Sequence, residues 1–260
     1  MDTNTKKLII NADDFGHTMG TSYGTIMAHL NGVVTSTTAL TVSPHFVPAM
    51  AAARALAPTL PIGVHLTFTL RGAKPILPPH LVPSLVDEEG YFRSRAEAIK
   101  RAVPDEVRIE FEAQILRFLE CGLYPSHLDS HHFVQDGTPE ILQVTVNLAE
   151  KYSLPLRCSL HGRAAFAAQH PQQKTPEAIF IDFYEENATL ERFTAILDRI
   201  VATEGEVFEM FCHPGFIDAD IQKLTDYGQW RVKELEILTS DGAKAAIAER
   251  NIILSNFGSI

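Results

Sequence analysis

The chain has 260 residues, 45% of them hydrophobic, and this length suits one α/β barrel or one doubly wound sheet, so we expect a single domain over residues 1–260. Its formal net charge of −10 at pH 7, without a cluster of lysines and arginines, argues against a nucleic-acid partner. Three cysteines without CxxC spacing indicate neither a disulfide framework nor a thiolate zinc site, and no run approaches the roughly 20 apolar residues of a membrane span, so we expect a soluble, cytoplasmic protein.

Short β-rich runs alternate with longer helical patterns along most of the chain. The expected strands cover residues 7–12, 36–43, 61–69, 126–132, 154–160, 206–212 and 251–257. The expected helices between them cover residues 21–30, 47–57, 105–121, 141–152 and 188–202. Such alternation is typical of βαβ units in a mainly parallel sheet, and seven or eight units indicate a barrel.

Residues 70–104 interrupt this alternation after the third expected strand. The segment is rich in proline and poorly periodic, and from Arg71 it reads RGAKPILPPHLVPSL. We expect it to form a lid-like excursion or a substrate wall rather than a linker between domains.

Aspartates and histidines lie at the ends of four expected strands. Asp13 and Asp14 close the first, His65 lies late in the third, SHLDSHH ends the fourth, and His213 follows EVFEMFC. In parallel barrels the carboxyl ends of the strands converge on one mouth, so we expect these side chains to meet there. The alternative interpretation of His213, which precedes Pro214-Gly215, is that it serves only to end a strand.

The adjacent carboxylates of Asp13 and Asp14 need a special arrangement. Neighbouring strand residues point to opposite faces, so the pair shares a site only where the backbone turns, and Phe15-Gly16 supplies that turn. A divalent cation would offset their repulsion and leave one acid as a ligand and the other as a base. Turn chemistry or a helix N-cap is the alternative interpretation of the pair.

Histidines would supply the other ligands of such a cation. Two imidazoles and one carboxylate, with a position open for water, form a common hydrolytic metal site, and this donor set suits zinc. His127 and His131 would bind one ion together on a helix, but their segment reads as a strand, so we assign His131 to the metal and His127 to a packing or supporting role behind it. Asp129 would orient a histidine or close a buried network, and His65 taken singly also fits a hydrogen-bonded core residue.

Six ordered motifs resemble the YdjC-like carbohydrate deacetylases, the family of the chitooligosaccharide deacetylases. They are NADDFG (11–16), NGVVTSTTALTVS (31–43), GVHLTFT (63–69), SHLDSHH (126–132), FCHPGFID (211–218) and RxxELxxL (231–238). The resemblance covers nearly the whole chain and implies a distorted TIM-like (β/α) barrel that removes N-acetyl groups from amino sugars with one divalent metal ion, usually magnesium. It also implies that Asp14, His65 and His131 hold the metal, that Asp13 is the catalytic base, and that His213 protonates the departing amine.

The pattern defines the substrate site less closely. Candidates for sugar contacts are the excursion, Phe183, Tyr184 and also His132, which alternates with the metal histidine and would otherwise face the barrel exterior. Family members commonly continue the fourth motif as HHHVH, whereas this chain has Phe133 and Gln135. That departure affects substrate contacts rather than the metal histidine.

Other polar residues have plainer interpretations. Arg231 and Glu234, a helical i,i+3 step apart, are compatible with a solvated pair. Histidines without a matching partner are interpreted as surface or packing residues: His17, His29, His45, His80, His161 and His170.

We therefore expect a hydrolase that releases acetate and a free amino sugar from a small carbohydrate such as a short chitooligosaccharide. The sequence leaves the oligomeric state open, and a homodimer is one candidate because many soluble barrels form symmetric dimers. Two alternatives remain: another metal-dependent hydrolase on the same barrel, acting on a phosphoester or a cyclic amide, and a non-catalytic sugar-binding protein. The candidate base Asp13 and acid His213 argue against a pure binder, because a binder needs neither.

Overall fold

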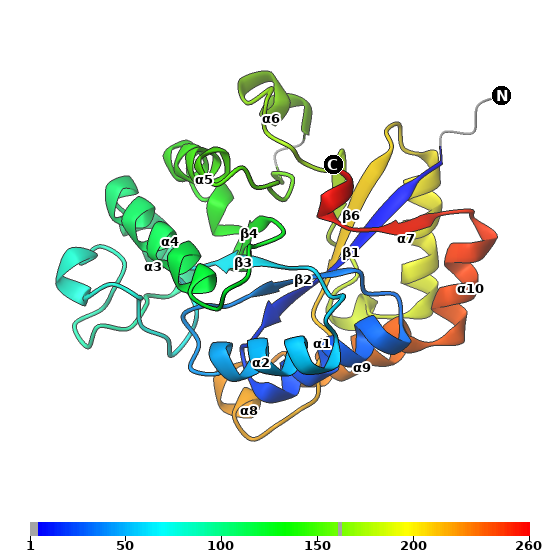
Figure 1. The fold of residues 1–260 in the computed structure, drawn as a ribbon, viewed down its shortest axis with the longest axis horizontal. Helices are drawn as coiled ribbons and strands as arrows, with labels where there is room; N and C mark the ends of the chain where they lie inside the picture. The colour runs from blue at the N-terminus through cyan, green and yellow to red at the C-terminus, as the bar shows by residue number, and fades with distance from the viewer. Residues whose placement is uncertain (1–4, 161–162) are drawn as a thin grey trace.

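The computed structural model describes residues 5–160 and 163–260, and its centre is a seven-stranded sheet in which every strand pairing is parallel. The strand order is β4-β3-β2-β1-β6-β5, and β7 pairs with the first residues of β1. The sheet curls into a half-barrel surrounded by helices (Figure 1), which confirms the expected α/β barrel in a distorted form. The strands are β1 (Lys7–Phe15), β2 (Ser36–Ala39), β3 (Ile62–Leu66), β4 (Leu128–Ser130), β5 (Ala178–Phe180), β6 (Val207–Cys212) and β7 (Ile253–Ser255).

Helices follow most of the strands and cover the outside of the sheet (Figure 1). The five expected ones are present as α1 (Met19–Asn31), α2 (Phe46–Leu56), α4 (Pro104–Leu119), α5 (Pro139–Lys151) and α7 (Leu190–Ala202). Three of them, α1, α5 and α7, start with a side-chain cap, because Thr18, Thr138 and Thr189 each accept a hydrogen bond from a backbone amide of the first turn. The sequence reasoning missed α3 (Arg95–Arg101), α6 (Arg163–Gln169), α8 (Ile221–Leu224), α9 (Gly228–Thr239) and α10 (Asp241–Glu249).

One expected strand was wrong and another was missed. Residues 154–160 form no strand, only an isolated parallel bridge between Leu156 and Leu128. Pro155 cannot donate a ladder hydrogen bond, which limits this run to irregular pairing beside β4. The strand that pairs with β6 is instead β5, whose three residues are too few to show alternation.

Alternation along β1 separates the outer core from the barrel interior. Leu8, Ile10 and Ala12 pack with α7 and α10 in a cluster of buried apolar residues. The opposite face begins with Ile9, which packs on the C-terminal Phe257, and continues upward with two polar residues, Asn11 and Asp13. The barrel interior is therefore apolar at the bottom and polar toward the carboxyl ends of the strands.

The excursion after β3 is ordered and holds little regular structure. It contains a short 3-10 helix, η1 (Pro79–Leu81), an antiparallel bridge between Val86 and Phe92, and α3.

In the part of the chain that the structure describes, no helix is long and apolar enough to cross a membrane. His161, interpreted from the sequence as a surface or packing residue, lies outside the described residues.

Candidate metal centre and active site

The end of β1 turns so that Asp13 and Asp14 face the same site. The pairing of β1 with β2 shifts register between Ala12 and Phe15, and Asp14 has a left-handed φ of 67°. Gly16 also has a positive φ, of 79°, and a Cβ there would lie 3.3 Å from the backbone of α2. The expected turn is therefore confirmed, and the opposite-face geometry of a regular strand is broken where two acids meet.

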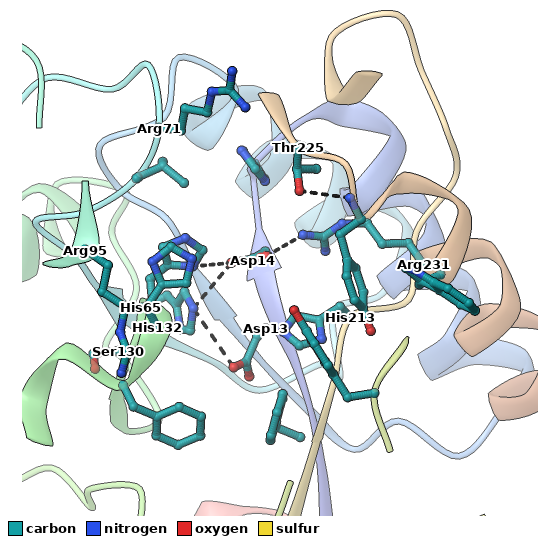
Figure 2. Close-up of a pocket in the computed structure, with 18 of the residues that line it drawn as sticks. Asp13, Asp14, His65, Arg71, Arg95, Ser130, His132, His213, Thr225 and Arg231 are labelled. Atoms are coloured by element: carbon teal, nitrogen blue, oxygen red, sulfur yellow. Dashed lines mark hydrogen bonds and ion pairs between the residues drawn. The ribbon is translucent and has the colours of Figure 1, made fainter. Parts of the chain in front are cut away.

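Asp14, His65 and His131 bring their candidate ligand atoms within 4.8 Å of one another. Asp14 Oδ1 lies 2.9 Å from His131 Nδ1 and 3.4 Å from His65 Nε2. Figure 2 shows Asp13, Asp14 and His65 pointing toward one another in the pocket. Asp14 Oδ1 is buried and accepts no hydrogen bond within the described chain, so a cation between these three donors would satisfy it. The donor set therefore fits a divalent metal ion.

Further side chains hold this cluster in place. Arg231 donates to Asp14 Oδ2 at 2.5 Å, and Asp129 Oδ1 lies 2.7 Å from His65 Nδ1. A proton on Nδ1 leaves the lone pair of Nε2 directed at the cluster. Burial opposes protonation of His65, but the carboxylates of Asp129 and Asp13 outweigh it and raise the pKa of His65 to about 10. Burial also disfavours the charged form of Asp14, yet His131 and Arg231 hold its pKa well below the usual range.

A second group with ligand atoms within 4.8 Å consists of Asp13, His65 and Asp129. Arg157 already supplies positive charge to this second group. Its two Nη atoms lie 2.6 and 2.7 Å from the oxygens of Asp13, and Nη1 also lies 3.0 Å from Asp129 Oδ2. Burial raises the pKa of Asp13, but the guanidinium outweighs burial and lowers it to about 2. Asp13 is thus ionised beside the first cluster and is bound to an arginine rather than to a metal.

Arg157 also contacts a third carboxylate, Glu209 on β6. Its Nε donates to Glu209 Oε1 at 2.8 Å, while Oε2 has no hydrogen-bond partner among the described residues. Burial raises the pKa of Glu209 to about 7 despite the nearby guanidinium. The sequence reasoning missed both residues. The available signal was an arginine inside the apolar run LPLRCSL, because arginine is almost never fully buried unless it is paired.

His213 follows β6 and is held by α9. Its backbone amide donates to Glu234 Oε2, its Nδ1 lies 3.7 Å from Glu234 Oε1, and Tyr227 donates its hydroxyl to the same carboxylate at 2.5 Å. Glu234 is fully buried and Arg231 is 4% exposed. The interpretation of Arg231 and Glu234 as a solvated pair is therefore wrong. The two residues lie one turn apart on α9, and Arg231 contacts Asp14 while Glu234 contacts His213.

A pocket of about 700 Å³ is lined by Asp13, Asp14, His65, His131 and His213. Aromatic side chains cluster around His213, with the rings of Tyr184 and Tyr227 stacked 4.5 Å apart. Leu70, Arg71 and Arg95 of the excursion also line the pocket, and Figure 2 shows Arg71 and Arg95 across the pocket from His213.

Of the candidate sugar contacts, Tyr184 and His132 line the pocket. His132 has a left-handed φ of 57°, and its Nδ1 lies 3.1 Å from Thr69 Oγ1, so it does not face the exterior. Phe183 is fully buried in the core against Phe193 and is not part of the pocket wall.

The residues that depart from the usual fourth motif have separate places. Phe133 lines the pocket and lies over Arg157, with 5.6 Å between the ring centroid and the guanidinium carbon. Gln135 is buried, and its backbone amide donates to Ser130 Oγ, so it shapes the loop after β4.

Two further buried histidines, His127 and His17, lie in different surroundings. His127 stacks on Phe257 with a centroid distance of 3.6 Å and lies outside the pocket, in a packing position. His17, interpreted from the sequence as a surface or packing residue, lines the pocket and is 5% exposed. Burial lowers the pKa of His17 to about 3, so its ring is neutral.

The fold and the site define an α/β half-barrel protein with a candidate divalent-metal centre at the carboxyl ends of its strands. Residues 7–249 match the family model of YdjC-like proteins, and the chain belongs to this family. A carbohydrate deacetylase of Enterococcus faecalis (strain ATCC 700802 / V583) is 48% identical over 98% of each chain, and one of Geobacillus stearothermophilus is 38% identical over 96% of each. A crystal structure from Enterococcus faecalis V583, described as that of a candidate cellobiose-phosphate cleavage protein, superposes with a TM-score of 0.96 at 48% identity and covers 98% of each chain.

Proposed function

We propose that this protein is a metal-dependent carbohydrate N-deacetylase that hydrolyses the acetamide of an amino sugar to acetate and a free amine. The observation that carries the proposal is the convergence of Asp14, His65 and His131, with the ionised Asp13 and the imidazole of His213 lining the same pocket. Curated relatives that span nearly the whole chain are named carbohydrate deacetylases, which supports the same reaction.

Asp14, His65 and His131 would hold the cation. When bound, a divalent ion supplies Lewis acidity that lowers the pKa of a water and polarises a carbonyl. The two nitrogen donors favour zinc, whereas resemblance to the family favours magnesium. Arg231 and Asp129 fix the ligand atoms before an ion arrives, which reduces the cost of ordering them.

Asp13 acts as the general base. It is held by Arg157 and lies 4.0 Å from Nε2 of His65, so its carboxylate stays ionised beside the candidate metal ligands, where it could take a proton from a water. The guanidinium reduces the basicity of Asp13, and in return it fixes both oxygens and prevents protonation from solvent at neutral pH.

His213 acts as the general acid. An amine leaves only when it is protonated, and an imidazole nitrogen is able to carry that proton and give it up. Glu234 accepts from the backbone amide of His213 and lies near Nδ1, so a proton on Nδ1 is stabilised, and the second proton of the imidazolium, on Nε2, is the one given to the leaving amine.

The pocket suits a small carbohydrate. Aromatic rings on one wall offer apolar faces to a sugar ring, and Arg71 and Arg95 on the other wall offer cationic donors. Short chitooligosaccharides are the first candidates. Because the solved relative is described in terms of cellobiose-phosphate and arginines bind phosphate, phosphorylated disaccharides belong in the same substrate panel.

The alternatives are another metal-dependent hydrolase on this barrel, acting on a phosphoester or a cyclic amide, and a non-catalytic sugar-binding protein. One experiment separates them: metal analysis of the purified protein, then measurement of acetate and primary amine across N-acetylated mono- and disaccharides, phosphorylated and unphosphorylated. We expect equal amounts of acetate and amine, dependent on the metal. Sugar binding without turnover, or release of phosphate alone, would contradict the deacetylase assignment.

A further inference from the structure

A second, smaller pocket of about 250 Å³ lies beside the first. The two pockets share four wall residues, His17, Leu70, Arg71 and Leu224. These residues form a partition between the candidate metal centre and the side pocket. Nothing in the proposed deacetylation uses the side pocket, although it shares these four residues with the pocket that holds the reacting groups.

His17 is the buried polar residue of this partition, which also contains the cationic Arg71. It is 5% exposed, and neither ring nitrogen has a hydrogen-bond partner within the described chain. Its backbone amide donates to the carbonyl of Asp14 at 3.0 Å, so His17 belongs to the turn that carries a candidate metal ligand, and both residues line the main pocket. A buried imidazole without a partner is costly unless a ligand satisfies it, and its N–H is available to an acceptor in either pocket.

The side pocket combines cationic and apolar groups. Arg71 and Lys223 bring positive charge to its wall, and Asp220, the acidic residue there, is paired with Lys223 at 3.2 Å and with His45 at 3.6 Å. The rest of the wall is largely apolar, formed by Pro44, Leu70, Ala73 and Leu224. A small carboxylate with a short alkyl group matches both parts, whereas a disaccharide is too large for this volume.

We propose that the side pocket receives the acetate released by the reaction, with the N–H of His17 guiding the carboxylate past the partition. This inference rests on the proposed function. In that reaction the water oxygen joins the acetyl carbon, the C–N bond breaks, the nitrogen takes a proton, and acetate leaves with a full negative charge. A separate path lets acetate depart while the protonated amino sugar, its natural counter-ion, still occupies the main pocket.

Direct binding of acetate tests the pocket without relying on turnover. The metal-loaded protein is titrated with ¹³C-labelled sodium acetate and followed by NMR line broadening. Two variants change the side pocket alone: Lys223→Glu reverses a charge on its wall, and Ala73→Leu places a larger side chain in its volume. Lys244→Glu is the matched control, because Lys244 also forms an exposed i,i+3 pair, with Asp241, and lines neither pocket. We expect Lys223→Glu to weaken acetate binding at least about fivefold, as loss of one nearby charge interaction allows, and Lys244→Glu to leave it unchanged.

Kinetics then relate the pocket to catalysis. With amine release as the readout, we expect acetate to inhibit at saturating sugar, and Lys223→Glu to raise the inhibition constant for acetate while the KM for sugar stays within about twofold of wild type. Unchanged acetate binding in both Lys223→Glu and Ala73→Leu would overturn the inference, and so would a raised KM for sugar with acetate inhibition intact, which would indicate a sugar subsite. Absence of any deacetylation in wild type would refute the proposed function instead. If Ala73→Leu fails to fold, Lys223→Glu still decides.

Discussion

Glu209→Gln is expected to raise the free energy of unfolding at alkaline pH and to leave it nearly unchanged in acid. Glu209 is fully buried and shares one guanidinium, that of Arg157, with Asp13 and Asp129. Three carboxylates around one cation leave an excess of buried negative charge. A neutral amide of the same shape removes one of these charges and keeps an oxygen for Arg157 Nε.

The magnitude follows from the shift in pKa. Burial raises the pKa of Glu209 from 4.5 to about 7 in the folded chain. Between these values the unfolded chain binds fewer protons than the folded one, so the stability of the wild type falls as pH rises. The shift corresponds to ~3 kcal/mol, all of it lost above the folded pKa. The amide introduced by Glu209→Gln has no proton to lose, so the advantage of this variant over the wild type grows by ~3 kcal/mol from acid to alkaline pH.

Urea unfolding of the metal-free protein at several values between about pH 4 and about pH 8.5, followed by circular dichroism, measures this difference. Glu236→Gln, an exposed position on α9, is the control and should show no such pH dependence. A Glu209→Gln variant that is destabilised equally at both ends of the range would refute the reasoning. It would mean that Glu209 is ionised in the folded protein and that its pairing with Arg157 outweighs its burial.

Three further predictions concern the candidate centre. Asp13→Asn should keep the metal but reduce turnover by ~10²–10⁴-fold, whereas His131→Ala should lose both, as metal content and amine release will show; normal turnover by Asp13→Asn would remove Asp13 as the base. Metal binding should release a proton from His65, because its pKa is raised to about 10. The apparent metal affinity should therefore rise by up to about tenfold per pH unit from about pH 6 to about pH 9. Competition titrations measure this affinity, and an affinity that does not change with pH would contradict the prediction. Arg157→Met should cost ~3–5 kcal/mol in urea unfolding at neutral pH because it leaves buried carboxylates uncompensated, and a loss below ~1 kcal/mol would show that they are already neutral.

Residues at strand ends were predictable because two simple regularities placed them. Alternation of strands and helices indicated a parallel sheet, and a parallel sheet brings the carboxyl ends of its strands to one edge. Asp14, His65 and His131 therefore lie together although they are far apart in sequence. The turn at the end of β1 was also predictable, because Asp13 and Asp14 cannot continue a regular strand and still share a site, and Phe15-Gly16 follows them.

Residues that support the site were not predictable in the same way. Arg157 lies on an irregular segment, and Arg231 and Glu234 lie on a helix that showed no strong apolar stripe, so no periodicity revealed that they point inward. Their positions depend on how α9 and the segment after α5 pack against the barrel mouth, which is a tertiary effect. Phe183 and Tyr184 show the same limit: neighbours in sequence, one enters the core and the other the pocket.

Charge around the pocket explains why these supporting residues are needed. Two buried arginines face an excess of buried acids, and in a low-dielectric interior such an excess is costly unless cations or protons remove it. A divalent ion would neutralise two of the three surplus charges, and a proton on the glutamate of β6 would neutralise the third. Without the ion, a proton on His65 takes over part of this role, which is why its pKa rises so far. The centre is therefore built to exchange protons for a metal ion, and the acids that set this balance are Asp13, Asp14, Asp129, Glu209 and Glu234.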